Sequence, residues 1–240
     1  RGHQALGGGP GGVVWPCGES FAWWFSWQKH GSASSSGDSS GDSSGGDSQC
    51  VPIDPEVSAA LSSGSVSSVL ELGCGTGVVG LTLATLGVQR VVATDGDGPS
   101  CALCAANAER ANLHTVATCE LRWGHTDLSH VAQRIGRGGR CAQWIVGGDV
   151  VYHPHSAREL EVTLRELLLL GGCCLVVLGW CERGQQAAEF LSKLSDLGTV
   201  RTVFRERSEK YSYLTKRNGR LARSEIEFGI SILSVHPHIT

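Results

Sequence analysis

A glycine-rich run at residues 71–77, with the sequence ELGCGTG, carries the strongest chemical signal in the chain. It ends an apolar stretch that begins at Val69. Glycines at a turn from a strand into a helix let the backbone approach a ligand, and they let the helix pack closely on its strand. Asp95 ends the next apolar run, where a carboxylate can accept hydrogen bonds from both hydroxyls of a ribose. Together these residues predict a site for a nucleoside-containing cofactor.

The spacing of the glycines distinguishes between two nucleoside-containing cofactors, a nicotinamide dinucleotide and S-adenosylmethionine. A nicotinamide dinucleotide fingerprint requires G-x-G-x-x-G, and the sixth position counted from Gly73 is Val78. The run is instead G-x-G-x-G preceded by Glu71, which is typical of S-adenosylmethionine, a cofactor without a pyrophosphate. The remaining alternative is a tight turn that binds nothing.

A second chemical signal follows the predicted strand 143–146. Asp149 and Tyr152 stand where that strand ends, in the crevice where open α/β sheets bind ligands. Methyl transfer from a sulfonium is an in-line displacement, so the enzyme mainly aligns and desolvates the nucleophile. Asp149 would attract and orient an ammonium group, and Tyr152 would form an apolar wall with one hydroxyl. The structural alternative is that Asp149 caps the helix that begins near Pro154.

Strands and helices alternate from residue 66 onward, and they must position these residues. The predicted strands are 69–72, 90–94, 115–121, 143–146, 173–180, 200–205 and 226–234; the predicted helices are 19–30, 54–62, 77–86, 99–112, 155–170 and 185–197. This alternation predicts βαβ units and a parallel sheet. No helix separates the last two strands, so we expect them to pair antiparallel. The expected fold is α/β: a Rossmann-like, doubly wound, seven-stranded sheet in a single domain, mostly parallel with an antiparallel last strand.

Composition limits the partners and divides the chain into three parts. Lys and Arg total 20 against 23 Asp and Glu, so the net charge of −3 gives no general attraction to nucleic acid. No stretch approaches the roughly 20 apolar residues that span a bilayer. Residues 1–30 hold an N-terminal segment and a helix, residues 31–49 a flexible Ser/Gly/Asp loop, and residues 50–240 the catalytic domain. The chain has no Met, so we expect a fragment or a processed product, from which any targeting signal could be missing.

The ten cysteines and two His-Pro-His pairs raise the question of a metal. Most cysteines lie in apolar runs, which indicates reduced, buried side chains. The pair Cys101 and Cys104 has no second pair at zinc-ribbon spacing. The pairs 153–155 and 236–238 have no accompanying carboxylate cluster. We therefore expect no metal and no disulfide framework.

The motifs above resemble those of class I, seven-β-strand methyltransferases, in which the ELGCGTG run is followed by an acid that ends the second strand. Three further segments narrow the resemblance to methyltransferase family 16, whose members are mainly protein-lysine methyltransferases. These segments are VVWP at 13–16, LRWG at 121–124 and DVVY at 149–152. The segment 223–230, RSEIEFGI, resembles the last strand of the methyltransferase-like 21 and valosin-containing-protein lysine methyltransferase type. Residues 31–49 are an insertion relative to that family.

The resemblance implies a set of cofactor-binding residues, which are Trp15, Glu71, Gly73, Cys74, Gly75, Asp95, Trp123 and Gly148. The glycine loop would contact the methionine part of S-adenosylmethionine, Asp95 would hold the ribose, and Trp123 would lie against the adenine region. Trp15 would close over the bound cofactor. Asp149 and Tyr152 are the candidate catalytic residues. The alternative for the two tryptophans is a role in packing.

The function predicted from these motifs is S-adenosylmethionine-dependent methylation of a protein lysine. One alternative is a protein-arginine methyltransferase of the methyltransferase-like 23 type, which shares the VWP and L-x-W-G-H motifs but tends to lack the tyrosine supplied here by Tyr152. A second is a catalytically inactive methyltransferase fold that serves as a binding protein; the intact glycine loop and Asp95 argue against it. By resemblance, the substrate would be a chaperone, an ATPase or a translation factor. The enzyme would be a monomer in the cytoplasm, with the nucleus as a second location.

Overall fold

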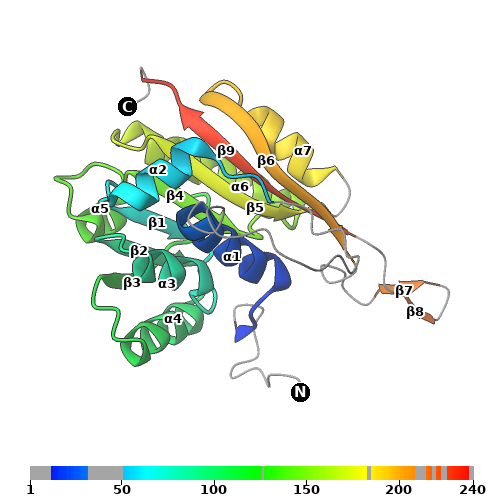
Figure 1. Ribbon diagram of the computed structural model, residues 1–240, viewed down its shortest axis with the longest axis horizontal. Helices are drawn as coiled ribbons and strands as arrows, with labels where there is room; N and C mark the ends of the chain where they lie inside the picture. Colours follow the sequence, from blue (N-terminus) through cyan, green and yellow to red (C-terminus); the bar gives the residue numbers. More distant parts are fainter. Residues whose placement is uncertain are drawn as a thin grey trace, which may run out of the picture.

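A seven-stranded sheet forms the centre of the computed structural model (Figure 1). The structure describes residues 12–31, 51–125, 127–182, 185–208, 215–217, 220–222 and 226–237. Apart from Gly31, the predicted loop 31–49 lies outside the described residues. No helix in the described part of the chain has the length and apolar character to cross a bilayer.

The strand order is β3-β2-β1-β4-β5-β9-β6. The strands are β1 (Val69–Leu72), β2 (Val91–Asp95), β3 (Val116–Glu120), β4 (Trp144–Gly148), β5 (Leu175–Cys181), β6 (Gly198–Ser208) and β9 (Ile226–Val235). Strands β1 to β5 pair in parallel, whereas β9 is antiparallel to both β5 and β6. From β1 the sheet is extended to one side by β2 and β3 and to the other side by β4 and β5. The carboxyl ends of β1 and β4 therefore open a crevice at this topological switch point. The predicted fold class is confirmed.

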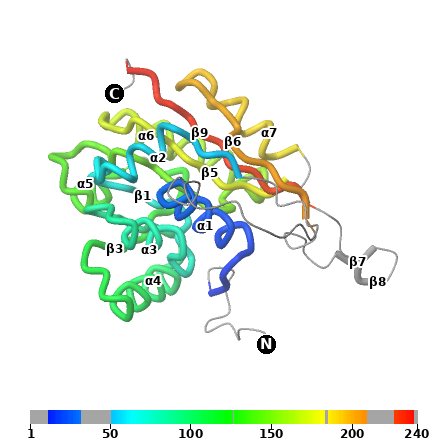
Figure 2. The backbone as a smooth tube through the Cα atoms, viewed as in Figure 1, coloured from blue at the N-terminus to red at the C-terminus, as the bar shows by residue number. Residues whose placement is uncertain are grey.

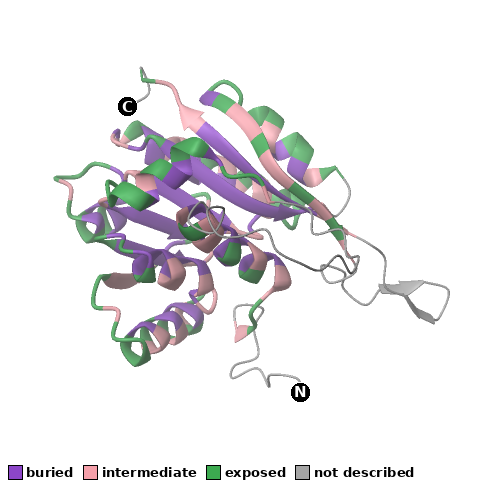
Figure 3. Ribbon diagram, viewed as in Figure 1, coloured by how far each residue is buried: buried purple, intermediate pink, exposed green. Residues whose placement is uncertain are grey.

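Helices cover both faces of the sheet. They are α1 (Pro16–His30), α2 (Pro55–Ser63), α3 (Val78–Thr85), α4 (Gly98–Arg110), α5 (Ser129–Ile135), α6 (Pro154–Leu169) and α7 (Gln186–Lys193). One core cluster joins α1, α2 and α3 to one face of the sheet, and a second joins α5, α6 and α7 to the other. Figure 3 shows the central strands as buried between these layers. Successive residues of β1 divide between the clusters, Val69 in the first and Leu70 in the second, because side chains of a strand alternate between faces.

The helix α1 lies across the middle of the sheet and contacts α3, β4 and β5 (Figure 2). The sequence predicts that it begins at Glu19, but it begins three residues earlier, because Pro16 takes the first helical position, where its missing N–H is not needed. Its inner face buries Phe21, Trp24 and Phe25. Trp23, in contrast, is 49% exposed.

Polar contacts hold the chain that follows the undescribed residues 32–50 against α1. The side chain of Gln28 is fully buried; its Oε1 accepts the N–H of Asp54 at 2.6 Å, and its Nε2 donates to the carbonyl of Pro52 at 3.1 Å. The carboxylate of Asp54 caps α2 by accepting the N–H of Val57 at 3.0 Å. Arg201 on β6 donates to the same carboxylate at 3.3 Å. These contacts connect the N-terminal helix to the far edge of the sheet.

Three elements are absent from the sequence-based prediction. The helix α5 has only seven residues, too few for a clear helical period. The strands β7 (Thr215–Arg217) and β8 (Arg220–Ala222) form a separate two-stranded sheet within the basic segment between β6 and β9. The other predicted helices and strands are present, with ends that differ by a few residues.

Candidate active site

A cavity of about 810 Å³ lies at the carboxyl ends of β1, β2 and β4. Eight of the ten predicted site residues line it, which are Trp15, Gly73, Gly75, Asp95, Trp123, Gly148, Asp149 and Tyr152. They come from the N-terminal segment, the glycine loop, the end of β2, the segment after β3 and the end of β4. The other two predicted residues, Glu71 and Cys74, are not among the lining residues.

The glycine loop adopts a backbone that side chains disfavour. Gly73, Gly75 and Gly77 have φ of +66°, +50° and +85°. A Cβ on Gly73 would lie 2.9 Å from a methyl carbon of Val150, and one on Gly77 would lie 2.5 Å from the sulfur of Cys104. Glycine is therefore required here for both conformation and space. The loop consequently brings bare backbone to the wall of the cavity.

Asp95 joins the glycine loop to the end of β2. Its carboxylate accepts the N–H of Gly75 at 2.9 Å and the N–H of Asp97 at 3.1 Å. Burial raises the pKa of Asp95 above its usual range, and the backbone hydrogen bonds from Gly75 and Asp97 act in the opposite direction. A half-buried carboxylate that still lines the cavity is suited to accept hydrogen bonds from the hydroxyls of a ribose.

Glu71 lies beneath the glycine loop and is only 1% exposed. Its Oε2 accepts the N–H of Gly80 at 3.1 Å, which connects β1 to α3. Burial raises the pKa of Glu71 to about 8. The structure thus places this acid in support of the loop. Direct contact of Glu71 with a cofactor stays a prediction.

Cys74 is also buried, at 5% exposure, and packs against Ala93 and Cys104. Hydrogen bonds to Cys101 and Cys104, together with burial, hold the pKa of its thiol above the ordinary value. Its backbone N–H donates to the carbonyl of Thr94 at 2.8 Å. This side chain anchors the loop to α4, and its contact with the cofactor likewise stays a prediction.

Trp123 lies over the glycine loop. The Cζ2 atom of its ring is 3.3 Å from the position of a Cβ on Gly73. Its indole N–H is buried and has no hydrogen-bond partner among the described residues. Because buried donors in native proteins are nearly always paired, an unpaired donor in a cavity wall indicates a place for a ligand. The aromatic face, the open glycine backbone and the carboxylate of Asp95 fit a nucleoside with an amino-acid tail.

Asp149 has a left-handed backbone, with φ of +59°, which is uncommon outside glycine. Its N–H donates to the carbonyl of Gly179 on β5 at 2.7 Å. Strain of this type is concentrated at functional sites, where the surrounding structure holds it in place. The next aromatic side chain, Tyr152, is 51% exposed at the rim of the cavity.

The alternative role of Asp149 as a helix cap is wrong. The N-cap of α6 is His153, whose ring Nδ1 accepts the N–H of His155 at 3.2 Å. Because Asp149 lies four residues before this cap, its carboxylate is not needed to begin the helix. The other ring of this pair, on His155, is 3.3 Å from the carboxylate of Glu159. His238 lies outside the described residues.

Several residues of the cavity wall were not predicted from the sequence. Arg122 and His125 flank Trp123, so the motif itself could have indicated them. Ser156 and Glu159 lie in the first two turns of α6, three residues apart on one helix face. No spacing in the sequence connects that helix to the glycine loop.

Comparisons with known proteins agree with this geometry. The family described as lysine methyltransferase matches residues 2–197. Protein N-lysine methyltransferase METTL21A of Xenopus tropicalis is 30% identical over 145 residues, which cover 59% of this chain and 62% of that protein. A UPF0665 family protein of Schizosaccharomyces pombe is 26% identical over 153 residues, which cover 62% of this chain and 43% of that protein. The chain thus spans about half the length of the curated relatives it matches.

Solved structures share the fold at low sequence identity. The crystal structure of EvdMO1 has a TM-score of 0.50 and 12% identity, with 74% of this chain and 39% of that chain covered. The N-terminal domain of EvdMO1, solved with SAH bound, has a TM-score of 0.48 and 11% identity, with 71% of this chain and 75% of that chain covered.

The family match covers most of the chain, and the cavity wall fits the nucleoside and the amino-acid end of one particular cofactor. That cofactor is S-adenosylmethionine, and the chain belongs to the lysine methyltransferase family.

Proposed function

We propose that this protein transfers a methyl group from S-adenosylmethionine to the side-chain amine of a lysine in a protein substrate. The observation that carries the proposal is the position of Asp149 and Tyr152 in the wall of the same cavity as Asp95 and the glycine loop. The similarity to a protein N-lysine methyltransferase supports the choice of lysine.

S-adenosylmethionine supplies an electrophilic methyl group on a sulfonium. The chain must therefore hold the cofactor, bring in the amine and exclude water. Asp95 accepts the ribose hydroxyls, and Gly73 and Gly75 leave room beside the backbone for the amino-acid end. Trp123 covers the base, and Trp15 covers the cavity from the N-terminal segment. Binding that fixes both reactants in line supplies much of the rate acceleration in reactions of this kind.

The acceptor side is formed by Asp149 and Tyr152. A lysine amine has an unperturbed pKa of about 10.4, so it arrives as an ammonium and must lose a proton before it attacks. The carboxylate of Asp149 attracts the ammonium and orients it toward the cavity. Tyr152, half exposed at the rim, provides an aromatic wall along the methylenes of the lysine. The proton then leaves to water at the open rim.

The test is incubation of the chain with S-adenosylmethionine labelled in its methyl group and a cell lysate. We expect label in protein, recovered as methyl-lysine after acid hydrolysis. Label recovered as methyl-arginine would instead establish arginine as the acceptor. That alternative is based on the L-x-W-G-H motif, whose histidine, His125, lines the cavity. Label in nucleic acid or in small molecules alone would contradict the proposal.

A binding protein without catalytic activity is the second alternative. Calorimetric titration with S-adenosylmethionine distinguishes an enzyme from such a binding protein, because a fold that does not bind the cofactor gives no heat of binding. The remaining expectations belong to this proposal too: a monomeric enzyme acting on a chaperone, an ATPase or a translation factor, in the cytoplasm and, as a second location, in the nucleus.

A further inference from the structure

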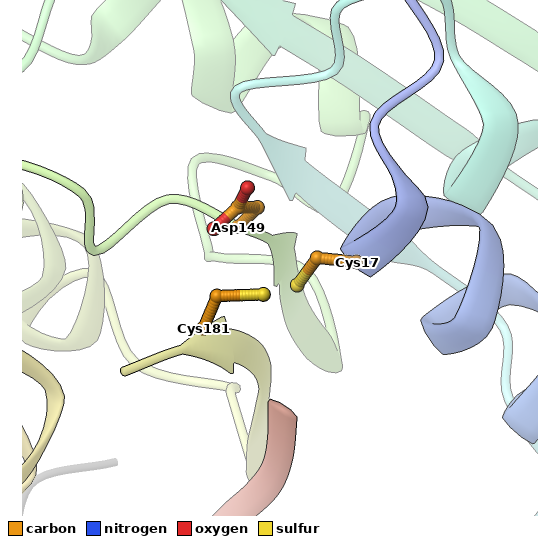
Figure 4. Close-up of side chains that lie close together, drawn as sticks. All are labelled: Cys17, Asp149 and Cys181. Carbon is orange, nitrogen blue, oxygen red and sulfur yellow. The ribbon is translucent and has the colours of Figure 1, made fainter. Parts of the chain in front are cut away.

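Three side chains with metal-binding atoms meet on the acceptor side of the cavity. The sulfur atoms of Cys17 and Cys181 and a carboxylate oxygen of Asp149 all lie within 4.8 Å of one another. Figure 4 shows the two sulfur atoms facing each other with Asp149 beside them. Cys17 lies in the first turn of α1, Asp149 follows β4, and Cys181 ends β5. In the part of the chain that the structure describes, no second group of three such side chains comes this close together.

We propose that Cys17, Cys181 and Asp149 form a binding site for a thiophilic divalent cation such as Zn²⁺. In tetrahedral zinc sites, sulfur lies about 2.3 Å and carboxylate oxygen about 2.0–2.2 Å from the metal, so neighbouring ligand atoms are roughly 3.5–3.8 Å apart. The three atoms here would need to approach one another by roughly an ångström or less to reach that geometry. Two thiolates select zinc and related soft ions over magnesium and calcium.

The surroundings of the three side chains suit such a site. Cys17 and Cys181 are each 1% exposed and belong to the core cluster under α1. Asp149 lines the cavity, so an ion would enter from that side. The backbone N–H groups at the start of the 15-residue helix α1 favour a negative ligand atom at Cys17. Binding converts the two thiols to thiolates and releases two protons to solvent.

An ion bound here changes what the cavity can do. Three protein ligands leave one tetrahedral position open, for water or a small ligand. Coordination would then occupy the carboxylate of Asp149 and fix its orientation, so it no longer accepts a hydrogen bond from an ammonium group. This consequence rests on the proposed function; the metal site itself does not. The cofactor side, with Asp95 and Gly75, involves none of the three ligands.

The site is tested by titrating the full chain, reduced and freed of metal, with Co²⁺ and then with Zn²⁺. Tetrahedral Co²⁺ bound to thiolates gives visible d–d bands and a near-ultraviolet charge-transfer band. We expect both bands at about one ion per chain, and their loss when Zn²⁺ displaces Co²⁺. Cys17→Ala and Cys181→Ala should each weaken Co²⁺ binding by more than the roughly 10–100-fold that loss of a supporting residue around a metal site costs.

The matched control is Cys141→Ala, which removes a fully buried thiol from the other core cluster. It should leave the Co²⁺ spectrum and affinity unchanged. Thermal unfolding without metal shows whether each variant is folded. Equal Co²⁺ affinity in the wild type and in the folded Cys17→Ala and Cys181→Ala variants would overturn the site.

A second measurement tests the consequence for methyl transfer. Stoichiometric Zn²⁺ should abolish transfer by the wild type, a chelator should restore it, and Cys17→Ala should stay active in Zn²⁺. Calorimetric binding of S-adenosylhomocysteine should be unchanged by the ion. If Zn²⁺ binds at the site and transfer continues, the metal site stands but the role proposed for Asp149 toward the lysine is contradicted.

Discussion

At the scale of single residues, the cavity separates two carboxylates with different tasks. Asp95 is held by the N–H groups of Gly75 and Asp97, on the cofactor side. Asp149 is placed by a left-handed backbone and by its hydrogen bond to Gly179, on the acceptor side. Each can therefore be changed without removing the other from its position.

The first prediction concerns Asp149→Asn. Asparagine tolerates the left-handed backbone, so the fold should be retained. We expect kcat to fall by about 10²-fold or more, the effect of losing one preorganised electrostatic contact. The Kd for S-adenosylmethionine, measured by calorimetry, should change little. A parallel loss of cofactor binding would show that Asp149 does not act on the acceptor side.

The second prediction concerns Asp95→Asn, which has the opposite profile. Hydrogen bonds to a charged acceptor contribute about 1.5–3 kcal/mol, so the Kd for the cofactor should rise by roughly 10–100-fold. At saturating cofactor, kcat should approach that of the wild type. The two substitutions serve as controls for each other, because each replaces one carboxylate of the same cavity by its amide. Unchanged cofactor affinity would remove Asp95 from the ribose site.

The third prediction follows from the buried Glu71. Its pKa is raised from 4.5 to about 8 by burial, so between these pH values the folded chain keeps a proton that the unfolded chain has released. Stability therefore falls as the pH rises through this window and is fully present only below it. Each unit of difference is worth about 1.4 kcal/mol, which makes the total loss several kcal/mol.

Glu71→Gln should remove this dependence, since glutamine keeps an oxygen for the N–H of Gly80. The measurement is the difference in Tm between variant and wild type from pH 5 to pH 9. We expect the Tm of the variant relative to the wild type to rise with pH up to about pH 8 and to stay constant above it. Glu109→Gln, which removes an exposed carboxylate from α4, is the control. A difference that does not vary with pH would mean that Glu71 is ionised in the folded chain.

At the scale of elements, the N-terminal helix α1 packs closely on the sheet because two residues beneath it are glycines without side chains. A Cβ on Gly179 in β5 would lie 2.8 Å from Cγ of Phe21, and one on Gly148 in β4 would lie 3.4 Å from the backbone of Gly18. These two glycines let α1 lie directly on the strands. Because Trp15 precedes α1, the depth at which the helix packs also sets the position of the cavity cover.

The fourth prediction is that Gly179→Ala destabilises the fold by roughly 1–3 kcal/mol through overpacking against Phe21. We also expect weaker cofactor binding, because α1 and Trp15 must move outward. Gly18→Ala is the matched control within the same interface. Its Cβ would lie at an ordinary 3.4 Å from Val78, and alanine fits the helical backbone of the first turn better than glycine does, a gain of less than about 1 kcal/mol. Thermal unfolding of both variants should therefore shift in opposite directions; a stable Gly179→Ala would show that α1 is free to adjust.

At the scale of the whole molecule, ligand binding and folding are coupled. The cavity is formed by elements from distant parts of the chain, from Trp15 to Glu159, so a ligand that fills it binds the folded state alone. Saturation at 100 times Kd contributes about 2.7 kcal/mol. For a chain of this size each kcal/mol raises Tm by about 2–4 °C.

The fifth prediction is thus a rise in Tm of about 5–10 °C with S-adenosylhomocysteine at 100 times its Kd. Differential scanning fluorimetry measures it directly. Adenosine diphosphate, which has an adenine and a ribose but no amino-acid end, is the control and should give a smaller shift. An equal shift with both ligands would contradict a site built for the amino-acid end.

The sequence by itself determined the order and type of most elements, the glycine loop and the two acids after β2 and β4. Each of these follows from local patterns, such as alternation along a strand, a glycine that needs positive φ, or an acid at the end of a strand. The antiparallel β9 was predictable for the same reason, since no helix separates it from β6. The short α5 and the pair β7–β8 gave no comparable local pattern.

Only the tertiary structure decided which of the motif residues face the cavity and which support it. Glu71 and Cys74 lie within the motif, yet both side chains point into the core. Glu71 lies beneath α3, where it accepts the N–H of Gly80, and Cys74 packs against Cys104 of α4. The convergence of Cys17, Asp149 and Cys181 likewise has no counterpart in spacing along the chain. It arises because α1 packs across β4 and β5, which are distant from α1 in the sequence. The energy of this contact depends on the burial of whole faces, so no local sequence pattern predicts it.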